Sequence, residues 1–484
     1  MKKFALLLLL TFTHSVFGQN LELDYSFGTD GFVTLPMDSD AGSFNVNRIQ
    51  NDGKILVCGQ RLNGTVREDF IARYNPDGTI DTSFANNGFY ICNDTINDIN
   101  GPNFFILSNG KIICVIGDVQ GEITKLNTDR NVDTTFGTNG KMNFNYFNDG
   151  TAYLDANDNL YVGSGTLNQL IKINTITGTL DTSFGTNGII NLESSFGKIY
   201  SFENDKFLVK SNFFDSSTIP TTYHPAIKRF NSNGTLDTSF GTNGTLLLYY
   251  TTTPSELNSI IFNVDVDHSN SVLYVTQSSF SSFITTIRKF DSNGNLISSF
   301  GNSGTVTLPA NNDIIRTQLH NNKLYLAGAN NAIANYNTTL LRYDANGAVD
   351  YTFHSNGIYI ENTNSLLEWA KCISVNPDGS LIVSGEYING NMYKLFLAKY
   401  IPSTLNNTTF GADFDIKYNN PMGDQLEFFS NKTIASIALY NLYGKQVGFS
   451  CTNQIETANL ASGMYIAKVT SSDDESKIVK VVKN

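Results

Sequence analysis

Seven basic side chains recur at a fixed place in a repeated pattern, and they are the first candidates for chemistry. They are Arg73, Lys125, Lys172, Arg229, Lys289, Arg342 and Lys399. Seven equivalent cations around one face would bind an anionic glycan. A residue repeated in every unit more often serves the fold, and repeated acids offer partners for ion pairs. These acids are Asp81, Asp133, Asp181, Asp237 and Asp350. We therefore predict structural ion pairs.

The turns that follow most of these cations are a second candidate, because their Asp and Asn side chains carry oxygens that ligate calcium. We call this turn, which reads Asn-Pro-Asp-Gly at residues 75–78, the Asx-Gly turn. An EF-hand loop has its glycine sixth and a glutamate twelfth, whereas here the glycine is fourth. In a hairpin turn, Pro presets φ and Gly takes a positive φ. We predict hairpin turns and no cofactor, with structural calcium as the alternative.

No familiar catalytic motif organises the reactive side chains. The histidines beyond the leader are scattered, and they are His224, His268, His320 and His354. The chain has no HExxH pattern, no GxSxG elbow and no phosphate loop. The carboxylates in 203–205 and 265–267 are of a kind that any acidic chain carries. We assign no catalytic residue and no metal ligand.

Binding residues are expected where the repeated pattern is interrupted. The segment 212–225 is an insertion ahead of a standard strand, and residues 249–258 form another. The only tryptophan stands at the start of a strand run in the last unit. Aromatic side chains on loops suit stacking against sugar rings, although an aromatic near a strand more often belongs to the core. The predicted binding residues are Phe213, Phe214, Tyr223, His224 and Trp369.

Composition excludes some classes of partner. The formal net charge is −12, and only 16% of residues are charged, against about 25% in ordinary domains. An acidic chain without a basic stripe argues against nucleic-acid binding and against adhesion to anionic lipid. The five cysteines show no CxxC pair. We predict buried thiols, with one disulfide in an oxidising compartment as the alternative.

Residues 1–18 read as a secretory signal peptide. Lys2 and Lys3 supply the positive start, and Phe4 to Leu10 supply an apolar run. This run is shorter than the roughly 20 residues that span a bilayer; a retained membrane anchor is the alternative. No later segment is long and apolar enough to span. The mature protein is therefore expected outside the cytoplasm, without a transmembrane segment.

One phrase recurs eight times, and it reads Asp-Thr-Ser-Phe-Gly-Thr-Asn-Gly at residues 181–188; we call it the Phe motif. Its aromatic residues are spaced at about 48–60 residues. They are Phe27, Phe84, Phe136, Phe184, Phe240, Phe300, Phe353 and Phe410. A large aromatic side chain in each unit is predicted to pack between adjacent units.

The unit between the first two Phe motifs contains four strand-like runs separated by turn signals. The runs are residues 32–35, 44–49, 54–58 and 70–74. Such a unit is predicted to form an antiparallel meander that must stack on its neighbours to bury both faces.

Eight motifs bound seven units, which predicts an all-β, seven-bladed β-propeller of four-stranded antiparallel blades over residues 19–412. The first motif follows the leader, so N- and C-terminal strands are expected to complete one blade together. An open solenoid is the alternative.

These repeats resemble the delta-60 repeat of secreted bacterial proteins. The resemblance rests on residues 180–188 and on Asn376-Pro377-Asp378-Gly379 with the strand run that follows, and it extends over roughly residues 20–412. Ile297, Ala85 and His354 depart from the pattern. The resemblance implies a propeller-like extracellular module and no defined chemistry.

The last segment, residues 413–484, abandons the repeat and contains strand runs that suit a small C-terminal β-sandwich. It resembles the type A sorting domain of the type IX secretion system of Bacteroidetes. The matching residues are Tyr418, Asn420, Pro421, Gly444, Gly463, Tyr465, Lys477 and Lys480. Asn419 stands where that family usually has proline. A carbohydrate-binding sandwich is the alternative.

By resemblance, the type IX secretion machinery is a partner, and the product is secreted or held at the outer cell surface after passage through the periplasm. The first hypothesis for its activity is a non-catalytic binding or adhesion module for a glycan or a protein. The second is an extracellular hydrolase or lyase acting on polysaccharide, and the third is a purely structural surface component.

Overall fold

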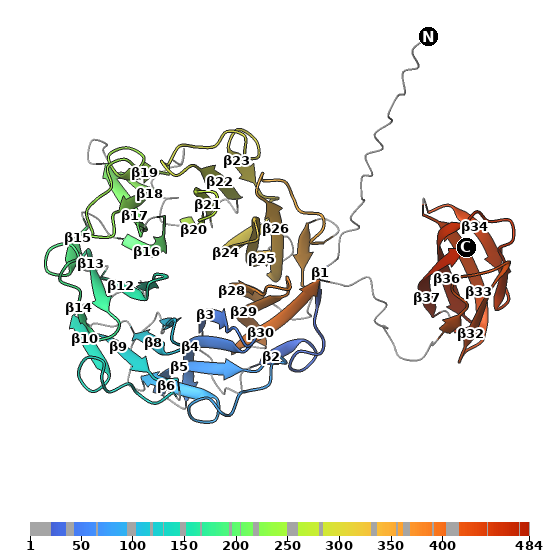
Figure 1. Ribbon diagram of the computed structural model, residues 1–484, viewed down its shortest axis with the longest axis horizontal. Helices are drawn as coiled ribbons and strands as arrows, with labels where there is room; N and C mark the ends of the chain where they lie inside the picture. Colours follow the sequence, from blue (N-terminus) through green and yellow to red (C-terminus); the bar gives the residue numbers. More distant parts are fainter. Residues whose placement is uncertain are drawn as a thin grey trace, which may run out of the picture. The chain divides into compact units, whose positions relative to one another are not determined.

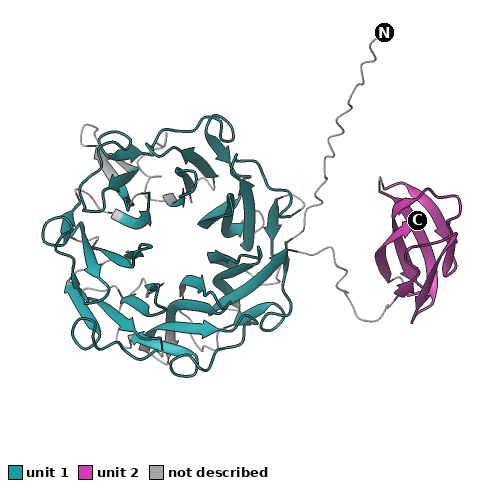
Figure 2. Ribbon diagram, in the orientation of Figure 1, with its two compact units in different colours: residues 1–403 teal, residues 404–484 magenta. Residues whose placement is uncertain are grey.

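The computed structural model describes residues 21–483 with interruptions. The residues left out within that range are 35–42, 64–65, 94–102, 117–119, 129, 146–151, 165–166, 193–195, 204, 216–221, 249–259, 280–283, 331–335, 355–356, 362–367, 390–391, 403–415, 443 and 474. The chain divides into two compact units, Met1–Ser403 and Thr404–Asn484 (Figure 2). The predicted signal peptide lies outside the described residues, as does the predicted boundary at residue 412.

Unit 1 is built from seven antiparallel sheets among the described residues. Blade 1 consists of β3 (Ser43–Ile49), β4 (Ile55–Asn63), β5 (Val66–Tyr74) and β6 (Phe89–Asn93). Blade 2 consists of β7 (Asn103–Ile106), β8 (Ile112–Ile116), β9 (Gln120–Leu126) and β10 (Lys141–Asn145). Blade 3 consists of β11 (Ala152–Leu154), β12 (Asn159–Ser164), β13 (Gln169–Asn174), β14 (Thr179–Leu180) and β15 (Ile189–Asn191).

Blades 4 to 6 follow the same plan. Blade 4 consists of β16 (Phe196–Ser201), β17 (Phe207–Asp215), β18 (Thr222–Phe230) and β19 (Thr245–Leu247). Blade 5 consists of β20 (Ile260–Asp267), β21 (Val272–Ser279), β22 (Ile284–Phe290) and β23 (Thr305–Thr307). Blade 6 consists of β24 (Asn312–His320), β25 (Lys323–Asn330), β26 (Asn337–Asp344) and β27 (Ile358–Ile360). The sheets form a ring in which the first strand of a blade, such as β3, β16 or β24, lies towards the centre (Figure 1).

Both ends of the ring meet in blade 7, which contains β28 (Glu368–Val375), β29 (Leu381–Asn389) and β30 (Met392–Pro402). Its outer edge is supplied by β1 (Leu21–Leu23) and β2 (Phe32–Thr34), which both pair with β30. Asp24 in the first Phe motif also pairs with Lys399, at 3.0 Å from Nζ to Oδ2. The predicted closure of the ring by N- and C-terminal strands is therefore confirmed.

The grouping of strands differs from the sequence prediction by one strand. Residues 32–35 were expected to open the first meander, but β2 pairs with β30 of blade 7, and blade 1 is completed by β6. The Phe motifs from Phe84 to Phe353 therefore each lie inside a blade, between its third and its outermost strand. A repeat pattern sets the order of strands, whereas their assignment to sheets depends on hydrogen bonds between chain segments.

The Phe motif packs neighbouring blades together, as predicted. Its aromatic side chains are buried from Phe27 to Phe353, and each belongs to an apolar cluster that draws on two adjacent blades. Phe184, for example, packs with Tyr161 of blade 3 and with Phe207 and Val209 of blade 4. The last copy, Phe410, lies outside the described residues.

The repeated cations form ion pairs at six of their seven positions, and five of these pairs involve the predicted acids. The distances between the nitrogen and the carboxylate oxygen run from 2.7 Å for Arg73–Asp81 to 3.5 Å for Lys125–Asp133. The others are Lys172–Asp181, Arg229–Asp237, Arg342–Asp350 and Lys399–Asp24. Where Ile297 replaces the acid, Lys289 instead donates to the carbonyl of Ala345 in the next blade, at 2.9 Å.

At five junctions, a glycine of the Phe motif bonds to the turn that follows the third strand of the next blade. The N–H of Gly185 donates to the carbonyl of Asn233 at 2.8 Å, and four other junctions repeat this bond. Gly234, with φ of +87°, lies against this contact, and a Cβ there would stand 3.0 Å from Phe184 and 3.1 Å from the Gly185 nitrogen. The Asx side chains bind their own turn, since Asn233 accepts from the N–H of Thr235.

Unit 2 contains two antiparallel sheets around one apolar core. One sheet consists of β31 (Ile416–Tyr418), β32 (Gln425–Ser430) and β35 (Gln454–Glu456). The other consists of β33 (Ile434–Asn441), β34 (Gln446–Ser450), β36 (Gly463–Ser471) and β37 (Ser476–Lys483). This arrangement is consistent with the expected sandwich.

Candidate functional site

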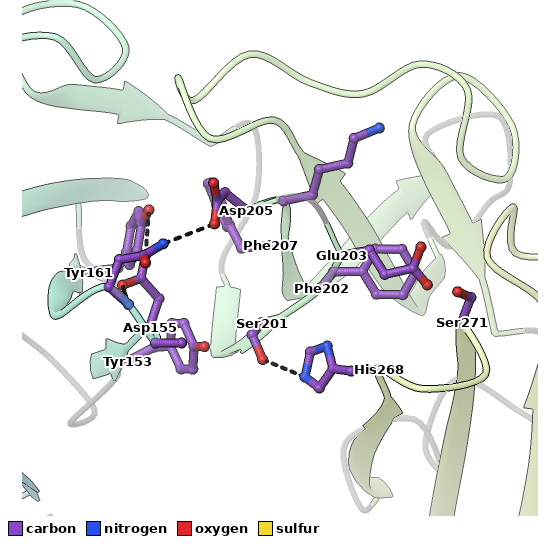
Figure 3. Close-up of a pocket in the computed structure, with 13 residues that line it drawn as sticks. Tyr153, Asp155, Tyr161, Ser201, Phe202, Glu203, Asp205, Phe207, His268 and Ser271 are labelled. Atoms are coloured by element: carbon purple, nitrogen blue, oxygen red, sulfur yellow. Dashed lines mark hydrogen bonds between the residues drawn. The ribbon is translucent and has the colours of Figure 1, made fainter. Parts of the chain in front are cut away.

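A pocket of about 500 Å³ opens where three successive blades present the turn between their first two strands (Figure 3). Blade 3 contributes the end of β11, residues 155–157 and Tyr161. Blade 4 contributes residues 201–203 and 205–207, and blade 5 contributes His268 and Ser271. The three turns occupy the same place in their units. Because the repeated fold brings them side by side, residues far apart in the sequence line one hollow.

Aromatic rings form one wall of the pocket. Tyr153 and Tyr161 stack with their centroids 6.2 Å apart, and Tyr161 contacts Phe207 of blade 4 at 5.1 Å. Tyr161 and Phe207 are buried, whereas Tyr153 is partly exposed and offers its ring to the hollow. Burial raises the pKa of Tyr153, so its hydroxyl stays protonated near neutral pH.

Carboxylates line the pocket beside these rings, and they differ in the hydrogen bonds that they already accept. Asp155 accepts hydrogen bonds from the backbone N–H groups of Asn157 and Asn159. Asp205 accepts from the side-chain amide of Asn157 across the blade junction, at 3.0 Å. Glu203 has an Oε1 that is buried and accepts no hydrogen bond from the described residues. A buried acceptor without a donor is costly unless a ligand or water supplies one.

A serine and a histidine meet at the blade 4 edge of the pocket. The Ser201 hydroxyl and the Nε2 of His268 lie 3.0 Å apart. Such a pair is the start of a nucleophile–base arrangement, which also needs an acid to orient the histidine. Among the described residues, no carboxylate is hydrogen-bonded to the other ring nitrogen of His268, and no group of three or more His, Cys, Asp or Glu residues could hold a metal ion.

The predicted binding segment around residues 212–225 forms a paired extension of β17 and β18. Phe213 lies opposite His224, and Phe214 lies opposite Tyr223. These strands are nine residues long, as are β4 and β5, so they are no longer than the corresponding strands of blade 1. The four side chains lie outside the described part of the chain, as does the segment 249–258.

Trp369 lies on β28 in blade 7, away from the hairpin of blade 4. It is partly buried, and its ring packs against Tyr336 of blade 6 with the centroids 5.2 Å apart. The structure therefore does not bring the five predicted binding residues together. The hairpin also leaves the edge of blade 4 opposite to the pocket, because the two turns lie at opposite ends of β17. A binding role for these residues stays a prediction.

The pocket residues Glu203, Asp205 and His268 are not among the predicted binding residues. A signal was present, because these residues stand at equivalent turns of consecutive units. The sequence could not show that the Oε1 of Glu203 is buried and accepts no hydrogen bond from the described residues, since this depends on how blades 3 to 5 pack.

The predicted sorting residues of unit 2 hold its two ends together. The Tyr418 hydroxyl donates to the carbonyl of Lys480 at 3.3 Å, and Asn420 accepts from the N–H of Val482 at 2.9 Å. Tyr465 is buried and donates to the carbonyl of Ala461. Gly444, with φ of +74°, lies in the turn between β33 and β34, and Gly463 begins β36. Pro421 follows a cis peptide bond.

The two remaining sorting residues, Lys477 and Lys480, lie on β37. Asn419, which stands where the sorting-domain family usually has proline, contacts β32. Its side-chain oxygen accepts a hydrogen bond from the N–H of Glu427 at 2.8 Å.

The fold and these contacts define a repeat propeller that is joined to a small two-sheet domain. Residues 50–84 and 215–240 match the family described as a domain of unknown function (DUF5122) beta-propeller. Residues 417–484 match the secretion system C-terminal sorting domain. The chain thus contains a delta-60-like propeller and a type IX sorting domain, and it is exported to the cell surface or secreted. No helix in the described residues is long and apolar enough to cross a membrane.

Solved structures with a similar course of the chain share little sequence with it. The beta-propeller domain of the trilobed protease from Pyrococcus furiosus is 12% identical with a TM-score of 0.43, and the match covers 77% of this chain and 98% of that one. Its propeller is described as an open velcro topology. The polysaccharide lyase Uly1 is 10% identical with a TM-score of 0.42, over 78% and 93%. Such distant likenesses say nothing about a ligand or an activity. No curated protein matches the chain.

Proposed function

We propose that this exported propeller is a non-catalytic binding module for an extracellular glycan, which it takes up in the pocket between blades 3, 4 and 5. The observation that carries the proposal is the Glu203 carboxylate, which lines a hollow of about 500 Å³ and whose buried Oε1 accepts no hydrogen bond from the described residues. A sugar hydroxyl supplies such a donor.

The lining suits a sugar ring in two further respects. The partly exposed ring of Tyr153 offers an apolar face, while Ser201, His268 and Asp205 offer hydrogen-bonding groups around it. Ligand sites commonly combine an apolar wall with a few placed polar groups in this way.

The ring of repeated cations does not compete as a glycan site. Arg229, for example, is committed to Asp237 and lies over the ring of Phe240, at 4.7 Å from its centroid. An anionic polysaccharide would have to replace these internal partners.

Charge indicates which glycans enter. Asp155, Glu203 and Asp205 are carboxylates, and the one lysine of the lining, Lys206, pairs with Asp237 at 2.7 Å. A uronic acid would place another carboxylate among these acids. Neutral sugars and amino sugars, which donate hydrogen bonds, fit the pocket better.

The test is binding of the purified full chain to oligomers of a neutral glucan, an amino sugar and a polyuronate, measured by calorimetry. We expect binding to a neutral or amino-sugar oligomer and none to the polyuronate. Replacing Glu203 by Gln removes one charged acceptor, which weakens affinity roughly tenfold to a hundredfold. Glu386→Gln is the matched control, because Glu386 lies in blade 7, outside the pocket, where its carboxylate pairs with Lys371.

Each other outcome identifies a different function. Release of reducing ends from any of these oligomers would show an enzyme and contradict the proposal. Binding that Glu203→Gln leaves unchanged would place the glycan elsewhere, with the hairpin at Phe213 to His224 as the next candidate. Capture of a protein without glycan binding would support protein adhesion instead.

A further inference from the structure

Two buried cysteines from neighbouring blades meet inside unit 1. The Sγ atoms of Cys92 in blade 1 and Cys114 in blade 2 lie 3.0 Å apart. Cys114 is fully buried, and Cys92 is only 9% exposed. A disulfide has its sulfurs about 2.05 Å apart, so a small rotation of the two side chains would bring them into bonding distance.

The backbone of β6 turns Cys92 towards blade 2. In the ladder with β5, Ile91 lies opposite Phe70 and Asn93 lies opposite Asp69, which leaves Cys92 as an extra residue. Such a bulge re-aims the side chain of the residue that it leaves unpaired. Cys114 occupies a regular place in β8, opposite Thr124 in β9. The contact thus comes from the geometry of two separate blades.

The junction of blades 1 and 2 also departs from the usual glycine contact. Ala85 stands where the other Phe motifs mostly have Gly, and Arg130 stands where the Asx-Gly turn has Gly. The guanidinium of Arg130 lies over the ring of Phe84, at 5.4 Å from its centroid. Both glycines of the repeated contact are therefore replaced at the junction that the two cysteines span.

We propose that Cys92 and Cys114 form a disulfide that ties blade 1 to blade 2 in the exported protein. The sorting domain marks a chain that is exported to the cell surface or secreted, and disulfides form and persist outside the cytoplasm. The bond closes the chain segment that passes from the outer strand of one blade to the first strands of the next.

The reaction is an exchange with a disulfide oxidant, such as oxidised glutathione or an oxidoreductase of the periplasm. One cysteine thiolate attacks the oxidant and releases a thiol, and the second thiolate then attacks the mixed disulfide and releases another. Two protons and two electrons leave the cysteine pair, and the oxidant disulfide becomes two thiols. Burial raises the pKa of Cys92 well above its usual value, so the step occurs before the junction closes.

Counting thiols in the full chain, produced by export to an oxidising periplasm, tests the proposal. Among the five cysteines, only Cys451 is exposed, so one thiol should react with an alkylating reagent in the native protein. We expect three to react after denaturation without reductant and five after reduction, with the peptides of Cys92 and Cys114 linked. Five reactive thiols without reductant would overturn the proposal, as would a link that involves Cys58.

Stability measurements give a second readout. The urea midpoint of the wild type should fall when reductant is added, and that of Cys92→Ala should not change. Cys372→Ala is the matched control, because Cys372 is buried in blade 7 and should keep the response to reductant. A wild-type midpoint that ignores reductant would contradict a bond between the blades, even if the variants fold poorly.

Discussion

The guanidinium of Arg229 and the carboxylate of Asp237 are joined by a 2.7 Å contact from Nε to Oδ2 inside blade 4. Lys206 reaches the same carboxylate oxygen at 2.7 Å, and Asp237 also accepts from the hydroxyl of Ser239. Arg229 further donates to the carbonyl of Ser292 in blade 5. The acid of the Phe motif therefore holds a cation that connects two blades.

Replacing Asp237 by Asn should destabilise the propeller by about 3–5 kcal/mol, because it leaves buried positive charge without its partner. The measurement is the free energy of unfolding in urea at neutral pH. Asp181→Asn is the control, since its side chain is 26% exposed against 9% for Asp237, and it should cost about 1 kcal/mol or less. Equal losses in both variants would contradict a role for burial.

Acid should weaken the ring through the same carboxylates. Hydrogen bonds from Lys111 and Thr135 hold the pKa of Asp133 well below its usual value. At Asp350, burial alone would raise the pKa, but hydrogen bonds from Thr352 and Lys323 and the charge of Arg342 lower it to about 2. A lowered folded-state pKa stabilises the fold above the ordinary value of about 4. Stability should therefore fall between about pH 4 and pH 2.

Chemical denaturation of the full chain in a pH series would measure this loss. The Asp237→Asn chain supplies the control, because it has one such carboxylate fewer and should lose less stability over the same interval. A flat profile in both chains would contradict the assignment.

Asp265 should act in the opposite direction and over a higher pH range. Burial raises the pKa of Asp265 to about 6, although hydrogen bonds from Thr317 and from the backbone N–H of Leu319 act to lower it. An acid with a raised folded-state pKa favours the fold while it is protonated. Stability is therefore lost as the pH rises from about 4 to about 6, and the loss remains above that range.

Asp265→Asn removes this titration and keeps the shape of the side chain. Its melting temperature relative to wild type should increase from pH 4 to pH 6 and then stay constant. Asp344→Asn is the control, because Asp344 is partly exposed at the end of β26. A difference between Asp265→Asn and wild type that does not vary with pH would argue that Asp265 titrates normally.

Gly234→Ala should destabilise the ring beyond the effect of its backbone conformation. Both Gly234 and Gly379 have φ near +85°, so a Cβ is strained at either position by about 1–2 kcal/mol. Only at Gly234 would that Cβ also meet Phe184 and Ile190 of the neighbouring blade, whereas at Gly379 the nearest atom is 3.5 Å away. The urea midpoint of Gly234→Ala should be lower than that of Gly379→Ala. Equal midpoints would show that the neighbouring blades can move apart enough to accommodate the added Cβ at Gly234.

Much of the architecture could be predicted from the sequence, because the repeat reports local needs that every blade shares. The spacing of the Phe motifs indicated seven units, and the fixed offset between Arg229 and Asp237 indicated an ion pair. The pairing of β2 with β30 could not be assigned in this way, since strand grouping depends on contacts between distant segments. The predicted binding residues were chosen as exceptions to the repeat, and the structure places Trp369 and the hairpin in different blades.

By itself, the sequence determined the repeat, its count and the address carried by the sorting domain, because these are properties of residue spacing and of short motifs. Only the tertiary structure decided which turns share a pocket and which cysteines meet. Glu203 and His268 lie in different units, as do Cys92 and Cys114, and nothing in their local sequence distinguishes them from other polar turns or apolar strands. Blade packing brings each pair together, because closing the ring sets every unit against its neighbour at one fixed rotation.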